Sequence, residues 1–288
     1  MKKILLHQFV GSLTLTLVVL CVFYVFLKEF GSIILGKRDL SPTGEKRLVL
    51  DDVNKLNLYY KFRLSNRSNK VSNNLTFNFS LPVFASVNLV SIDLNIAPYA
   101  NEIFEYRHEF YVLTDRGREG YGEFLGIAGH GEESKRRLQS ILRSFTPDEE
   151  PFSEKIYQFI VNYVDLSGFH ARARGAFYAL DSGEADCTEY MQLFIALART
   201  AGIPARGVIG YVYDRDTKID PKDAHNWAEF WDGERWRVAD PQRGVFMENE
   251  DHYIPFKILD DDGSYVGEMP PLYWLEGENI EGLELRMI

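Results

Sequence analysis

Residues 181–204 read Asp-Ser-Gly-Glu-Ala-Asp-Cys-Thr-Glu-Tyr-Met-Gln-Leu-Phe-Ile-Ala-Leu-Ala-Arg-Thr-Ala-Gly-Ile-Pro. Apolar residues recur there with helical periodicity from Cys187 to Ala201. Gly202 is typical of the residue that follows a helix, and Pro204 cannot continue one. We therefore predict a buried amphipathic helix with Cys187 in its first turn. The free N–H groups and the positive dipole end at this position favour a thiolate, which is the reactive form of cysteine.

Cys187 is one of two cysteines in the chain, and the other, Cys21, lies in an apolar N-terminal run. The rest of the chain therefore has a single thiol and can form neither an internal disulfide nor a cysteine-based zinc site. A lone cysteine is usually a small buried apolar residue. A chemical role for Cys187 thus depends on partners elsewhere in the sequence.

Two such partners lie in a predicted hairpin. Residues 224–231 read Ala-His-Asn-Trp-Ala-Glu-Phe-Trp, Asp232-Gly233 follows, and residues 234–241 read Glu-Arg-Trp-Arg-Val-Ala-Asp-Pro. An Asp-Gly pair between two β-rich runs predicts a two-residue hairpin loop. That loop would place His225 directly opposite Asp240, where the carboxylate can orient the imidazole and stabilise its protonated form. A three-residue loop would offset the pair, so the prediction depends on the turn.

These segments together resemble the transglutaminase-like superfamily, and best its bacterial, often membrane-bound branch. The matching motifs are Ala-Asp-Cys-Thr-Glu-Tyr around Cys187, the Ala-Gly-Ile-Pro-Ala-Arg that follows, His-Asn-Trp-Ala-Glu-Phe-Trp around His225, and the Asp-Pro at Asp240. The resemblance covers about residues 150–243. It implies an α+β, papain-like catalytic domain in which the cysteine helix packs on an antiparallel sheet that carries the histidine and the aspartate. It also implies thiol chemistry on amides: transglutamination, deamidation or peptide hydrolysis.

The predicted catalytic residues are Cys187, His225 and Asp240. A thiolate would attack an amide carbonyl of a protein or peptide substrate, with the histidine as base and then acid, and water or an amine would resolve the thioester. The N–H of Cys187 can donate one hydrogen bond to the oxyanion, and Gln158, Tyr178 or another upstream side chain could donate the second. No cofactor is expected, because this thiol chemistry needs none. No metal is expected either, because the carboxylate-rich loop 214–223 lacks the ligand pattern of an EF-hand.

The motifs leave the acyl acceptor open. They contain no obvious amine site, although Trp227 or Tyr211 could line an apolar channel for one. Hydrolysis by a peptidase or deamidase is therefore the first expectation, and amine transfer the second. The alternative to an enzyme is an inactive transglutaminase-like module that binds or scaffolds other proteins in the cell envelope.

The N-terminus predicts a membrane anchor. The run from Phe9 to Leu27 has no formal charge and is long enough to cross a bilayer as a helix. We assign residues 1–30 to the anchor, with residues 8–27 in the membrane; a removed signal peptide is the alternative. A long domain after a first hydrophobic segment usually crosses the membrane. We therefore expect a single-pass protein with its soluble domains outside the cytoplasm, periplasmic or extracellular.

The remaining chain predicts two domains. After a linker at residues 31–45, alternating segments over residues 46–146 predict a β-rich accessory domain that resembles a small β-sandwich. A polar break at residues 146–151 contains two prolines, and the catalytic domain is expected over residues 151–288. The net charge of −10 and the absence of a basic stripe argue against nucleic-acid binding.

Overall fold

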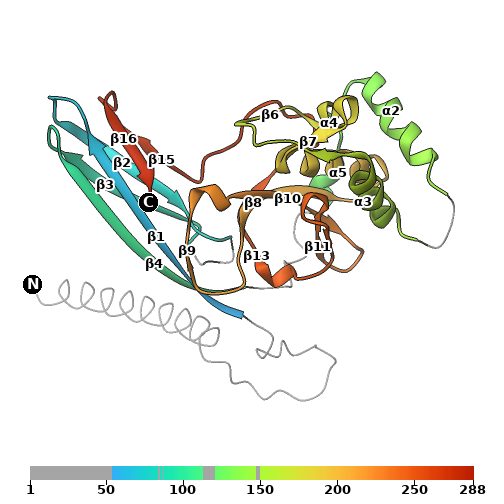
Figure 1. Cartoon of the computed structure of the whole chain (residues 1–288), viewed down its shortest axis with the longest axis horizontal. Coiled ribbons are helices and arrows are strands. Elements are labelled where there is room, and N and C mark those ends of the chain that lie inside the picture. Colours follow the sequence, from blue (N-terminus) through green and yellow to red (C-terminus); the bar gives the residue numbers. More distant parts are fainter. Residues whose placement is uncertain (1–53, 84, 86, 113–120, 147–149) are drawn as a thin grey trace, which may run out of the picture. The chain divides into compact units, whose positions relative to one another are not determined.

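The computed structural model describes residues 54–83, 85, 87–112, 121–146 and 150–288 (Figure 1). The predicted anchor of residues 1–30 and the linker of residues 31–45 lie outside this part of the chain. Among the residues that are described, no helix is long and apolar enough to cross a membrane.

The C-terminal part of the chain combines four helices with an antiparallel sheet, which confirms the predicted α+β class. The helices are α2 (Glu132–Arg143), α3 (Phe152–Tyr163), α4 (Ala176–Ser182) and α5 (Cys187–Thr200). The five-stranded sheet has the order β12-β11-β10-β8-β13. Its strands are β8 (Ala205–Val212), β10 (His225–Trp231), β11 (Trp236–Asp240), β12 (Val245–Phe246) and β13 (Tyr253–Leu259).

Helix α5 lies in the centre of this part of the molecule. Every residue from Thr188 to Arg199 is buried, because α2, α3 and α4 pack on one side of the helix and the sheet packs on the other. Ala228 and Phe230 of β10 belong to the same apolar core as the helix. Two short strand pairs join the surrounding loops: β5 (Asp165–Leu166) with β7 (Glu184–Ala185), and β6 (Arg172–Ala173) with β14 (Gly267–Glu268).

The N-terminal strands form two further sheets. One has the order β16-β1-β4, with β9 (Thr217–Lys218) parallel to β1, and the other has the order β15-β2-β3. Their strands are β1 (Asn54–Asn66), β2 (Ser72–Ser80), β3 (Leu89–Ile96), β4 (Asn101–Val112), β15 (Tyr273–Glu276) and β16 (Leu283–Met287). Each of these sheets therefore takes one strand from the C-terminal end of the chain.

Aromatic rings join the two N-terminal sheets. Phe62 of β1 packs on Phe77 and Phe79 of β2, with ring centroids 4.8 and 5.2 Å apart. The same core contains Tyr211 of β8 and Phe256 of β13, so it reaches the five-stranded sheet. The separate β-sandwich domain of residues 46–146 and the boundary at residues 146–151 stay predictions.

Candidate active site

Cys187 is the first residue of α5, as its sequence predicts. The preceding residue, Asp186, accepts a hydrogen bond from the Thr188 N–H at 2.9 Å, and its own N–H donates to Glu189 Oε2 at 3.2 Å. This reciprocal capping box fixes the backbone on both sides of the thiol. Cys187 itself is partly exposed, so a substrate can reach it.

Glu189 is fully buried beside the thiol-bearing turn and is held by Arg174. The Arg174 guanidinium donates to Glu189 Oε2 at 2.6 Å, and the Arg174 N–H donates to Oε1 at 2.9 Å. Burial opposes the charge of Glu189, but the hydrogen bonds from Arg174 and from the backbone hold the pKa of this carboxyl below its usual value. An ionised Glu189 keeps the capping box intact.

His225 and Asp240 meet on the sheet next to Cys187. His225 Nε2 lies 2.7 Å from Asp240 Oδ2, and Cys187 is near enough to contribute to the raised pKa of the imidazole. Because Nε2 faces the carboxylate, Nδ1 is the nitrogen left for the thiol. The Tyr253 hydroxyl of β13 donates to the same Asp240 oxygen at 2.9 Å. Both His225 and Asp240 are buried, so water does not compete strongly for these contacts.

The electrostatics of His225 follow from this burial. Burial alone would lower the pKa of the imidazole, but the hydrogen bonds and negative charges of Asp240 and Cys187 outweigh it and raise the pKa to about 9. An imidazolium at neutral pH stabilises a neighbouring thiolate and holds a proton that it can give to a leaving group.

The register of the hairpin differs from the prediction. Trp231 pairs with Trp236 and Ala228 with Ala239, so the loop contains the four residues 232–235 instead of two. The Asp232 carboxylate accepts hydrogen bonds from the N–H groups of Glu234 and Arg235, at 2.8 and 2.9 Å, and thereby stabilises the longer turn. A shift of two residues keeps each side chain on its face of the sheet. His225 and Asp240 therefore still meet, although not as directly opposed residues.

Cys187 opens into a cleft with a volume of about 470 Å³. Most of its lining is apolar or aromatic: Phe169, Ala171, Ile209, Tyr211, Pro221, Ala224, Met269, Pro270, Leu272 and Tyr273. The other lining residues are His170, Thr188, Asn226 and Glu268. Tyr211 thus lies where a channel residue was predicted, whereas Trp227 is buried outside the lining.

The two side chains suggested from the sequence as second oxyanion donors do not line this cleft. Gln158 is exposed on α3. The Tyr178 ring stacks against Arg174, with the guanidinium carbon 3.8 Å from the ring centroid. The structure instead places Asn226 at the cleft, where its Nδ2 donates to Thr188 Oγ1 at 2.8 Å. Asn226 could not be recognised from the sequence, because it reads as a strand residue that alternates away from His225.

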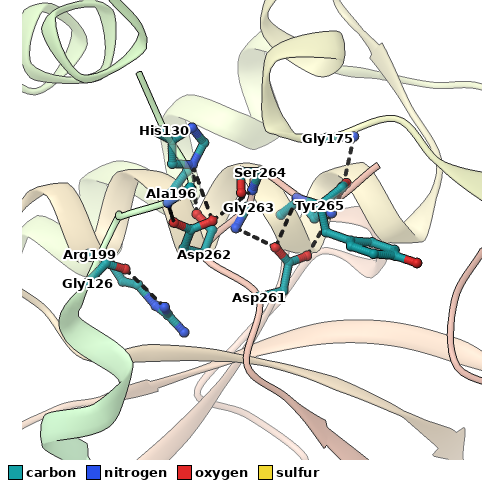
Figure 2. A network of polar contacts seen from close by, with 12 residues as sticks. Gly126, His130, Gly175, Ala196, Arg199, Asp261, Asp262, Gly263, Ser264 and Tyr265 are labelled. Atoms are coloured by element: carbon teal, nitrogen blue, oxygen red, sulfur yellow. Dashed lines mark hydrogen bonds and ion pairs between the residues drawn. The ribbon is translucent and has the colours of Figure 1, made fainter. Parts of the chain in front are cut away.

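A polar network fixes the segment that leads to one wall of the cleft (Figure 2). Asp261 accepts hydrogen bonds from Gln192 Nε2 of α5 at 2.7 Å and from the Gly263 N–H at 2.9 Å. Its neighbour Asp262 accepts from the Gly129 N–H at 2.7 Å. Gln192 Nε2 also donates to the Tyr265 carbonyl at 2.9 Å, so Asp261 and Tyr265 are attached to α5 and Asp262 to the loop before α2. The wall residues from Glu268 onward follow this segment.

The fold and the geometry of the site together define an α+β protein of the papain-like kind with a cysteine at a helix start. Residues 137–241 match the family model of the Transglutaminase-like superfamily. This part of the chain is a transglutaminase-like domain, which confirms the recognition from the sequence motifs.

Two kinds of relatives accompany this match. The Protein-glutamine gamma-glutamyltransferase of Pseudomonas aeruginosa is 29% identical over 103 residues, which cover 32% of this chain and 15% of that protein. The chain therefore spans a small part of the length of this curated relative.

Among solved structures, a candidate cysteine protease from Cytophaga hutchinsonii aligns over 83% of this chain and 90% of its own, with 15% identity and a TM-score of 0.54. At this identity the likeness shows the fold alone. The periplasmic domain of TgpA from Pseudomonas aeruginosa aligns over 67% of this chain and 92% of its own, with 17% identity and a TM-score of 0.39.

Proposed function

We propose that this chain catalyses thiol-dependent acyl transfer on amide groups of proteins or peptides, with Cys187 as nucleophile. The observation that carries the proposal is the 2.7 Å contact of His225 with the Asp240 carboxylate, close to Cys187 at the start of α5, which helps to raise the pKa of the imidazole. The transglutaminase-like domain over residues 137–241 supports the same class of chemistry.

In the proposed reaction, the thiolate sulfur of Cys187 forms a bond to the amide carbonyl carbon. The carbon–nitrogen bond then breaks, and His225 gives its proton to the leaving nitrogen, which departs as ammonia or an amine. In the second half, His225 takes a proton from water or an acceptor amine as that nucleophile attacks the thioester. The Cys187 thiolate leaves, and Asp240 holds the imidazole oriented and stabilises its protonated form in both halves.

Hydrolysis is the preferred outcome, and amine transfer is the second candidate. Water reaches an open site unless the site excludes it. The apolar wall around Tyr211 favours transfer, because such a wall can shield a thioester from water and hold an alkyl amine. The gamma-glutamyltransferase among the relatives supports transfer as well.

We further propose that residues 8–27 anchor the chain in a membrane as a single span and that the domain lies outside the cytoplasm. Substrates would then be proteins or peptides of the envelope. The competing proposal is a scaffold that keeps the fold without catalysis.

The test uses the full chain in detergent, a glutamine-rich protein and an excess of labelled primary amine. We expect ammonia or peptide release that is lost in Cys187→Ser and retained in Cys21→Ser, which removes the other thiol. Faster amine incorporation than ammonia release would replace hydrolysis with transfer. If no product forms and Cys187 also reacts with iodoacetamide no faster than a model thiol, the scaffold proposal stands instead.

A further inference from the structure

A second hollow lies in the β-rich part of the chain and shares no residue with the cleft of Cys187. It has a volume of about 350 Å³, and most of its lining residues come from the ends of β1, β4 and β16. We call it the arginine hollow; its lining residues are Arg63, Ser65, Asn66, Arg67, Tyr99, Asn101, Glu284 and Arg286. The proposed thiol chemistry does not use any of them.

Two of its arginines face each other across a strand pair. Arg63 of β1 and Arg286 of β16 are directly opposed in the antiparallel ladder, and the next pair on the same face is Ser65 with Glu284. Side chains in such a position have Cβ atoms about 4.5–5.5 Å apart, and like charges there repel each other. Both side chains are exposed, so water and salt screen part of this repulsion, and a bound anion would remove the rest.

Glu284 does not supply enough negative charge. One of its carboxylate oxygens contacts Arg67 and the other contacts Arg286, so both oxygens are already engaged. Within the described part of the chain we find no ion pair for Arg63. Arg67 and Arg286 therefore share the one carboxylate of the hollow, and Arg63 is left without one, in a chain whose net charge is −10. The local excess of positive charge runs against the overall composition.

Tyr99 adds an aromatic surface to the hollow. Its side chain is 68% exposed, and its backbone has a φ of +57°, a left-handed conformation that bulky residues rarely adopt. Tyr99 follows Pro98 in the turn that the Ala100 N–H closes on the Ala97 carbonyl at 3.2 Å, and such a turn requires a positive φ at this position. The Tyr99 ring is thus an exposed flat surface beside the three guanidinium groups.

We propose that the arginine hollow binds a phosphate ester. A single guanidinium group can donate hydrogen bonds to both oxygens of a carboxylate. A phosphate has more oxygens and can accept hydrogen bonds from two guanidinium groups at once. The opposed Arg63 and Arg286 match that requirement. The organic part of the ligand would lie against Tyr99. This inference is independent of the proposed acyl transfer.

The test is calorimetric titration of the full chain in detergent at low ionic strength with inorganic phosphate, glycerol phosphate and phenyl phosphate. Arg63→Gln and Arg286→Gln should each weaken binding about tenfold or more, because each removes charge-assisted hydrogen bonds. Glu284→Gln should tighten binding, because it removes the carboxylate that competes for the arginines. Arg136→Gln is the matched control: Arg136 is an exposed arginine on α2, paired with Glu133 at 3.1 Å.

The three probes separate the sources of the phosphate. Tighter binding of phenyl phosphate, lost in Tyr99→Ser, indicates a ligand with a flat organic group; equal binding of glycerol phosphate indicates a lipid-type headgroup. Circular dichroism of each variant confirms that it has folded. The proposal is overturned if none of the probes binds the wild type, or if Arg63→Gln and Arg286→Gln bind as tightly as Arg136→Gln does.

Discussion

The imidazole of His225 is held between one carboxylate and one thiol, and its protonation determines what the site can do. Burial would lower its pKa, but Asp240 and Cys187 together raise it to about 9. A protonated His225 can supply the proton that an amide nitrogen needs to leave, so amide cleavage should weaken above that pH. Reaction of the thiol with an alkylating reagent needs no such proton.

The pKa of His225 can be tested directly. Nuclear magnetic resonance should show the His225 ring titrating near pH 9, and Asp240→Asn should lower this midpoint because the carboxylate charge is lost. Since the folded pKa lies above the unfolded value of 6.5, this group stabilises the fold fully below pH 6.5, and the contribution is lost as the pH rises through about 9.

Denaturant unfolding across that range should therefore show a loss of stability in the wild type that is smaller in Asp240→Asn. His252→Gln, at a partly exposed histidine outside the site, serves as the control and should keep the wild-type dependence. A midpoint of His225 near its ordinary value would contradict the inferred interaction with Asp240 and Cys187.

At the scale of elements, the approach of residues 261–265 to α5 requires a glycine. Gly263 has a φ of +88°, and a Cβ built on it would lie 2.5 Å from the Gln192 carbonyl oxygen and 2.9 Å from Ala196 Cβ. Both neighbours belong to α5, and a helix backbone cannot move aside cheaply. The contact thus sets the distance between the helix that starts at Cys187 and the segment that leads to the cleft wall.

Gly263→Ala should lower the free energy of unfolding by about 2–4 kcal/mol, through the left-handed backbone and the overpacking together. Gly202→Ala is the matched control, because Gly202 has a similar φ of +79° and nothing within 4 Å of the added Cβ. It should cost only about 1 kcal/mol. Equal losses in the two variants, measured by denaturant titration, would show that the close approach to α5 contributes nothing.

The sequence predicted those elements whose signals are local. Helical periodicity and Gly202 gave α5, and the Asp-Gly turn gave the hairpin of β10 and β11. The register was wrong because the side chain of Asp232 stabilises a four-residue loop, which no rule of strand alternation reveals. The predicted contact of His225 with Asp240 is nevertheless present, because the true register differs by two residues and both side chains stay on the same face of the sheet.

Other parts of the site depend on contacts between distant segments. Tyr253 reaches Asp240 only because β13 pairs with β8, and nothing in the residues around Tyr253 marks that pairing. The bond between Asp261 and Gln192 likewise joins positions 69 residues apart. The pairing of β15 and β16 with β2 and β1 was missed for the same reason, since each short strand finds its partner through burial in the folded chain.

At the scale of the whole molecule, one apolar core connects the N-terminal strands to the five-stranded sheet. Phe62 and Phe79 share this core with Tyr211 and Phe256, and the Phe256 ring lies 5.1 Å from that of Tyr211 and 6.5 Å from that of Tyr60. Asn57 of β1 is bonded to Asp216 through both its N–H and its side chain, at 2.8 and 2.9 Å. The described residues from 54 to 288 accordingly group as one compact unit.

A shared core predicts that the two regions unfold together. Phe62→Ala removes a fully buried ring from the β-rich part and should cost about 3–5 kcal/mol. In a unit of this size such a loss lowers the melting temperature by about 10 °C.

We expect the melting transitions followed by far-UV circular dichroism and by the reaction of Cys187 with a thiol reagent to shift together, although Phe62 lies outside the catalytic region. Phe230→Ala, in the core around α5, should shift the same two signals. If Phe62→Ala instead splits the melting curve and leaves the exposure of Cys187 at its wild-type temperature, the predicted boundary at residues 146–151 separates two independently folding domains.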